Sequence, residues 1–154
     1  MEYTALLEKQ ILGRLKIDNP WWTEGRIPSY YQEMSPRLYL DIFYHSIQRL
    51  IDEGVSPQNI IYVSVETPIY NNILLEQLFS LAKQILDKED SQEEFYVFFD
   101  EIQYLKDWEI NLKSLVDTYH NVKFVASGSA AAALKKSSNE SGAGRVTDFN
   151  LPPG

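Results

Sequence analysis

The sequence contains no cysteine and only two histidines, His45 and His120. The lack of cysteine excludes a disulfide framework and a thiolate zinc site, and a metal site built on histidine would need carboxylates as well. No apolar run approaches the ~20 residues that a membrane-spanning helix requires. The N-terminus, MEYTALLEKQ, also lacks the basic and apolar regions of an export signal. We therefore expect a cytoplasmic protein that does not associate with a membrane.

Positive charge is scarce as well. The 154 residues include 14 Lys and Arg against 22 Asp and Glu, which gives a formal net charge of -8. An acidic chain does not attract polyanions through its net charge, so a nucleic-acid role would need a local basic patch. The only directly adjacent basic pair is Lys135-Lys136. The sequence therefore predicts no nucleic-acid partner.

Hydrophobic periodicity predicts that helices and strands alternate along the chain. Apolar residues at helical spacing predict helices over residues 4–16, 36–53, 73–86 and 105–119, and β-branched or aromatic runs predict strands over 60–65, 95–100 and 122–126. Strands separated by helices favour right-handed crossovers and a parallel sheet. Trp21 and Trp22 follow the first helix, and we expect them to pack over a groove rather than to stack on a ligand.

Polar residues follow two of the predicted strands, where a parallel sheet gathers its functional side chains. Asp100 and Glu101 end the second strand, and Ser127, Gly128 and Ser129 follow the third. Two adjacent charges are costly to bury, so we expect both acids to face a crevice or the solvent. An acid at this place can hold hydrated magnesium while its neighbour orients a water for attack on a phosphoryl group.

Simpler structural interpretations of these residues are also open. The two acids could be a solvated strand end, and the Ser-Gly-Ser stretch could be a turn or a helix cap. Arg145 lies between Gly144 and Val146. It could reach a phosphate or pair with an acidic neighbour.

Taken together, several stretches resemble one family. These are residues 95–103 (FYVFFDEIQ) followed by Trp108-Glu109, residues 124–129 (FVASGS), Gly144-Arg145 and residues 151–153 (LPP). They resemble the bacterial and archaeal AAA-like P-loop ATPases that carry a C-terminal domain of unknown function. Residues 19–22 (NPWW) and 57–64 (PQNIIYVS) fit the same resemblance, which therefore extends over nearly the whole chain.

The resemblance implies ATP and magnesium as ligands and assigns a role to each candidate residue. Asp100 would bind the magnesium ion and Glu101 would be the base that orients the attacking water. Ser127 would be the sensor residue, Ser129 would lie beside the nucleotide, and Arg145 would sense the phosphates.

One departure from the family concerns the phosphate-binding loop. The sequence contains no Gly-x-x-x-x-Gly-Lys-[Ser/Thr], the loop that supplies a backbone cradle and a lysine for the phosphates. In the family it would precede the helix that contains residues 45–50, but here residues 38–44 run directly into that helix. We therefore expect a deletion of some 20 to 30 residues near Tyr44 and His45. Residues 151–153 lead into further sequence in the family, so the resemblance implies a chain that is cut before the family's C-terminal domain.

The predicted fold class is an α/β, three-layer, P-loop NTPase-like parallel sheet flanked by helices. It is partial, because the first strand and the phosphate loop are missing. We predict an N-terminal helix and aromatic segment over residues 1–35 and a partial ATPase core over 36–154.

Three functions are compatible with these features. The first is an ATP-binding and ATP-hydrolysing AAA-like core that is deficient in hydrolysis without its phosphate loop, so enzymatic activity is uncertain. The second is a non-catalytic module that engages a protein partner, or another copy of itself, through its acidic surface and aromatic N-terminal segment. The third, a magnesium-dependent phosphotransfer domain with Asp100 as nucleophile, is disfavoured because the end of the first strand offers only Glu66.

A missing strand also has a consequence for the sheet. In the family's strand order it lies beside residues 122–126, whose edge would be left unpaired with Lys123 as its only charge. We expect dimerisation through this edge, aggregation, or covering by residues 146–151, whose alternating pattern makes them our preferred candidate.

Overall fold

The computed structural model describes residues 2–29, 38–128 and 146–148, and the side chains of residues 6–29 and 43–128 within them. The helices are α1 (Glu2–Asp18), α2 (Trp21–Glu24), α4 (Leu38–Asp52), α5 (Leu75–Ile85) and α6 (Trp108–Thr118). The strands are β1 (Ile60–Ser64), β2 (Phe95–Asp100), β3 (Val122–Ala126) and β4 (Val146–Asp148), and short 3-10 turns are η1 (Pro57–Asn59), η2 (Pro68–Tyr70) and η3 (Ile102–Tyr104). These bounds confirm the helices and strands predicted from periodicity to within a few residues. In the part of the chain that is described, no helix combines the length and the apolar character needed to cross a membrane.

The strands form one sheet in the order β1-β2-β3-β4, and every neighbouring pair is parallel. Ser64 at the end of β1 is level with Asp100 at the end of β2, and Phe99 is level with Ala126 of β3. The predicted order, with residues 95–100 between the other two predicted strands, is therefore confirmed. The carboxyl ends of the first three strands meet at one edge of the sheet.

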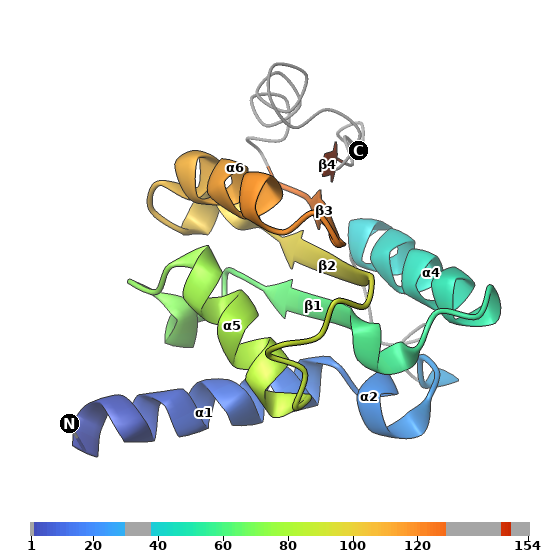
Figure 1. The fold of residues 1–154 in the computed structure, drawn as a ribbon, viewed down its shortest axis with the longest axis horizontal. Coiled ribbons are helices and arrows are strands. Elements are labelled where there is room, and N and C mark those ends of the chain that lie inside the picture. Colours follow the sequence, from blue (N-terminus) through green and yellow to red (C-terminus); the bar gives the residue numbers. More distant parts are fainter. Residues whose placement is uncertain (1, 30–37, 129–145, 149–154) are drawn as a thin grey trace.

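Helices cover both faces of the sheet, which makes three layers (Figure 1). On one face, Phe43 of α4 packs edge-on against Tyr62 and Phe98, with ring centroids 6.1 and 5.5 Å apart. On the other face, Phe79 of α5 packs against Phe124, with centroids 5.9 Å apart. Successive strand residues point to opposite faces, so the adjacent Phe98 and Phe99 of β2 supply different layers. The predicted α/β architecture is therefore confirmed.

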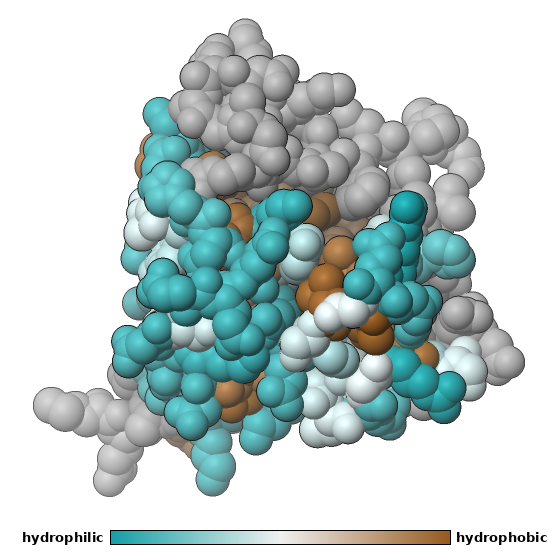
Figure 2. All heavy atoms as spheres, turned by 45° about the vertical axis from the view of Figure 1, so that its right-hand side comes forward, coloured by the Kyte–Doolittle hydropathy of each residue, from teal (hydrophilic) through white to brown (hydrophobic). Residues whose placement is uncertain are grey.

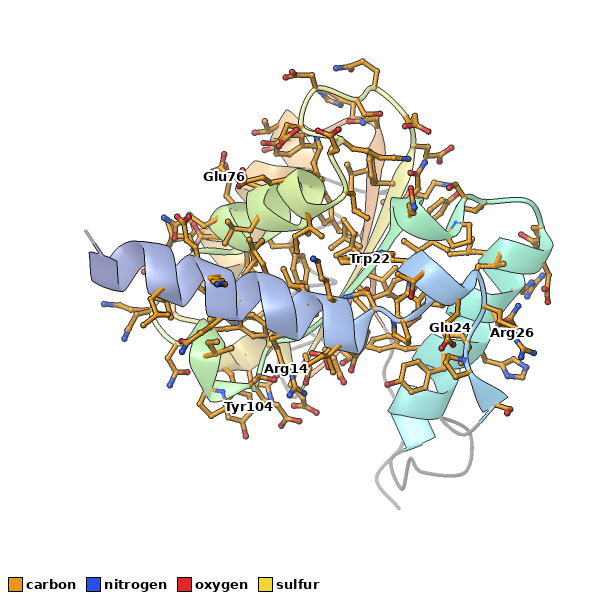
Figure 3. All side chains as sticks on the ribbon, turned by 90° about the horizontal axis from the view of Figure 1, so that it is seen from below. Arg14, Trp22, Glu24, Arg26, Glu76 and Tyr104 are labelled. Carbon is orange, nitrogen blue, oxygen red and sulfur yellow. The ribbon has the colours of Figure 1, made fainter. Side chains whose placement is uncertain are left out.

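The N-terminal segment closes the outer edge of β1. The Asn19 side chain accepts a hydrogen bond from the Tyr62 backbone N–H (2.6 Å) and donates one to the Tyr62 carbonyl (2.8 Å). The indole N–H groups of Trp21 and Trp22 both donate to the Ile60 carbonyl, at 2.9 and 2.7 Å. Both indoles are buried, and Trp22 lies between α2 and the sheet (Figure 3). The expectation that the tryptophans serve packing is confirmed.

The edge of β3 is covered by the chain itself. Residues Phe124, Val125 and Ala126 pair in register with Val146, Thr147 and Asp148 of β4. The preferred expectation for this edge is thus confirmed over 146–148, while residues 149–151 lie outside the described part of the chain.

Candidate functional site at the carboxyl edge of the sheet

Asp100, the last residue of β2, is buried with a relative exposure of 1%. Its Oδ2 accepts a hydrogen bond from the Tyr62 hydroxyl and its Oδ1 accepts one from the Ser127 hydroxyl, both at 2.7 Å. The expectation that both adjacent acids face a crevice or solvent is therefore wrong for Asp100. The cost of burying a carboxylate is offset because hydroxyl groups from two neighbouring segments reach it.

The strand register explains how these groups meet. Tyr62 is level with Phe98, and the two-residue period of a strand puts Phe98 and Asp100 on the same face. Beyond β3 the backbone continues alongside β2, because the Ser127 N–H donates to the Phe99 carbonyl at 2.9 Å. Burial, and next the Asp100 carboxylate, raise the pKa of Tyr62 well above its ordinary value. Tyr62 is therefore a neutral hydrogen-bond donor at physiological pH.

Glu101 is more exposed than Asp100. Its backbone is in the left-handed region, with φ 59° and ψ 50°. Its N–H donates to the Ser127 hydroxyl oxygen at 3.3 Å, and its Oε2 accepts a hydrogen bond from Gln103 Nε2 at 2.6 Å. Ser127 thus contacts both acids, and Gln103 holds the second one.

The Gln103 side chain leaves no space for a side chain at Gly128. A Cβ at residue 128, where φ is 146°, would collide with Gln103 Oε1. That oxygen is buried and has no hydrogen-bond partner among the described residues. Tyr62 and Gln103 were missed as site residues from the sequence. Gln103 lies within the FYVFFDEIQ stretch, and a signal for Tyr62 is its phenol hydroxyl group among the apolar residues of the predicted strand 60–65.

The structure brings Asp100, Glu101 and Ser127 together, as the sequence predicts for the ends of parallel strands. Glu66, after β1, is partly exposed. Ser129 and Arg145 lie outside the described residues, so their predicted roles stay predictions.

Residues 42–154 match the AAA domain family. The chain belongs to this family. It is also 31% identical over 83 residues to an uncharacterized protein of Methanocaldococcus jannaschii, a match that covers 54% of this chain and 17% of that protein. No solved structure matches the chain. The resemblance to AAA-like P-loop ATPases is thereby confirmed, together with the P-loop NTPase-like class of the fold.

AAA domains in general bind a nucleotide with magnesium, so the candidate site can be tested for its fit to both. Both Asp100 oxygens accept hydroxyl hydrogen bonds, and Glu101 Oε2 is held by Gln103. Within the described ranges, no group of three or more His, Asp or Glu side chains could hold a metal ion. Magnesium needs oxygen ligands with room for its waters. The printed sequence contains no Gly-x-x-x-x-Gly-Lys-[Ser/Thr] motif, which commonly binds phosphates. In this arrangement the described residues at the carboxyl edge do not fit a resident magnesium ion.

Proposed function

We propose that this chain is an AAA-type ATPase core that retains the acidic Walker B pair, Asp100 and Glu101, and the sensor residue Ser127, but does not hydrolyse ATP as it stands. The observation that carries the proposal is the meeting of these three residues at the carboxyl edge of the parallel sheet in a chain of the AAA domain family. The strained left-handed backbone of Glu101 supports it, because such strain is concentrated at functional sites.

Without the phosphate-binding loop we expect no ATP hydrolysis. Catalysis of phosphoryl transfer is almost entirely positioning and electrostatic stabilisation. Glu101 supplies a carboxylate for a water, and Ser129 and Arg145 supply groups for a nucleotide. None of these replaces the row of backbone N–H groups and the lysine that hold ATP.

We further propose that the protein is cytoplasmic and that it divides into an N-terminal segment (1–35) and a partial ATPase core (36–154).

The proposal is tested by measuring ATP binding and hydrolysis in the unmodified chain and in Glu101→Gln. We expect hydrolysis at background in both. Inserting a strand and a Gly-x-x-x-x-Gly-Lys-Ser loop between Tyr44 and His45 should produce ATP binding, and Glu101→Gln in that background should keep binding and stop turnover. Turnover in the unmodified chain that disappears in Glu101→Gln would show that the loop is not required and would contradict the proposal.

A second candidate function is a protein-interaction module derived from the same fold. Its aromatic N-terminal segment does not offer the expected docking surface, because Trp21 and Trp22 are buried. A hollow of about 290 Å³ between α4 and the strands β2 and β3 favours the module, since it is lined by Leu50, Tyr96, Phe98 and Val125 with charged residues at its rim. Figure 2 shows an apolar patch bordered by hydrophilic residues on the side of the molecule where α4 lies.

The two functions are separated by nucleotide binding and by mass in solution. ATP binding that appears once the strand and the Gly-x-x-x-x-Gly-Lys-Ser loop are inserted favours the ATPase core. Lack of nucleotide binding even after that insertion, together with an oligomer of the unmodified chain that grows with protein concentration in light scattering, favours the interaction module.

A further inference from the structure

We propose that in this chain as it stands, without the phosphate loop, Asp100 acts as an internal structural ion that joins β1, β2 and the residue after β3, and that in this arrangement its carboxylate does not bind metal ions. We call Tyr62, Asp100 and Ser127 the carboxylate clasp. Tyr62 belongs to β1, Asp100 ends β2, and Ser127 directly follows β3. The Asp100 side chain thus links the middle of β1, the end of β2 and the residue that follows β3.

The geometry of the clasp is that of a satisfied buried ion. The Tyr62 and Ser127 hydroxyl oxygens each lie 2.7 Å from a carboxylate oxygen of Asp100, the most common distance for O–H···O hydrogen bonds and one that a charged acceptor also forms. All three residues are buried, with exposures of 3% or less. Removing one partner of such a pair leaves a buried group without its hydrogen bond, which costs far more than the pair contributes net.

Backbone hydrogen bonds hold the same three segments together around the clasp. The Val65 N–H donates to the Asp100 carbonyl at 2.9 Å, and the Ile102 N–H donates to the Ser127 carbonyl at 3.0 Å. The Asp100 carboxylate therefore lies among three segments that backbone hydrogen bonds hold together. Magnesium keeps several waters in an octahedral shell, and reaching Asp100 would require these segments to separate and the two hydroxyl groups to leave.

The inference rests on the proposed function only in naming magnesium as the ion that Asp100 would otherwise bind. The test of this inference uses no nucleotide. The structural role of Asp100 can therefore be refuted while the proposed lack of ATP hydrolysis holds, and ATP hydrolysis can be found while the structural role of Asp100 holds.

The first experiment measures thermal unfolding of the full chain with and without magnesium chloride. We expect Asp100→Asn to lower Tm by about 5 °C or more, and we expect magnesium to leave the Tm of the unmodified chain unchanged. Glu101→Gln, the neighbouring acid, is the matched control and should fold with a nearly unchanged Tm. Magnesium that raises the Tm of the unmodified chain but not that of Asp100→Asn would overturn the inference, because ligands stabilise the state that binds them. Failure of Asp100→Asn to fold, with Glu101→Gln folded, would support it.

The second experiment removes the hydroxyl groups instead. Tyr62→Phe and Ser127→Ala should each lower Tm, whereas Tyr96→Phe, a partly exposed tyrosine of β2, should not. The triple variant Tyr62→Phe/Asp100→Leu/Ser127→Ala should melt at a higher temperature than Asp100→Leu alone, because it leaves no hydroxyl group unpaired. Unchanged Tm values in both single hydroxyl variants would overturn the inference even if no Asp100 variant folds.

Discussion

Asp18 ends α1 with a carboxylate whose side chain is only 12% exposed. Burial raises the pKa of Asp18, while Arg14, with its Nε 3.0 Å from Oδ2, opposes that shift only in part. The folded protein therefore binds this proton more tightly than the unfolded chain does. The resulting stabilisation is complete below the unfolded pKa of about 3.9 and is lost as pH rises through the folded value.

We predict that Asp18→Asn is more stable than the unmodified chain at neutral pH, by up to about 1 kcal/mol, and that this advantage shrinks as pH falls toward about 4. Urea unfolding across this pH range measures it. Asp117→Asn, at an exposed position of α6, is the control. An advantage that grows with falling pH would contradict a raised pKa for Asp18.

Residue 101 is a glutamate, although its left-handed backbone conformation favours glycine. We predict that Glu101→Gly stabilises the fold by roughly 0.5–1 kcal/mol, because glycine adopts the left-handed region without steric cost. Asp107→Gly is the matched control, since Asp107 has φ 56° and makes no capping hydrogen bond with its side chain. Denaturant unfolding checks both. A loss of stability in Glu101→Gly together with a gain in Asp107→Gly would contradict this prediction. It would show that contacts of the Glu101 side chain stabilise the fold, and the strained backbone of Glu101 would then not support a functional role.

At the scale of elements, Asn19 acts as a one-residue partner for the outer edge of β1. We predict that Asn19→Ala destabilises the protein by about 2–3 kcal/mol, because it leaves the buried N–H and carbonyl of Tyr62 unpaired. Trp21→Phe should cost less than Asn19→Ala, since the Ile60 carbonyl keeps the hydrogen bond from Trp22. Denaturant unfolding with amide exchange at Tyr62 measures this. Equal losses in the two variants would show that packing of the segment, and not edge pairing, dominates.

Which elements form could be predicted because each carries its own pattern. Residues 95–99 are uniformly apolar because helices cover both faces of β2, and the stripe of α4 continues through Tyr44 and His45 without a glycine or proline. Which side chains meet could not be predicted in the same way. The hydroxyl partners of Asp100 are 38 and 27 residues away in the chain. Gln103 reaches Glu101 only through a left-handed turn that no local pattern specifies.

At the scale of the whole molecule, the outer side of β1 and the outer side of β3 are each covered by another segment of the described chain. The 19–22 stretch closes β1, and β4 closes β3. An open, mostly apolar edge is a template for association. The state of β4 should therefore decide whether the molecule is monomeric.

Proline substitutions in β4 test this directly. Neighbouring N–H groups of a strand point to opposite sides, so of Val146→Pro and Thr147→Pro only one removes a hydrogen bond to β3, and the other is its matched control. We predict that one variant forms oligomers whose mass rises over a tenfold concentration range in light scattering, with faster amide exchange at residues 122–126, because proline cannot donate to the ladder. The other variant should behave as the unmodified chain does. If both variants stay monomeric with protected 122–126 amides, β4 is not what keeps the β3 edge from associating.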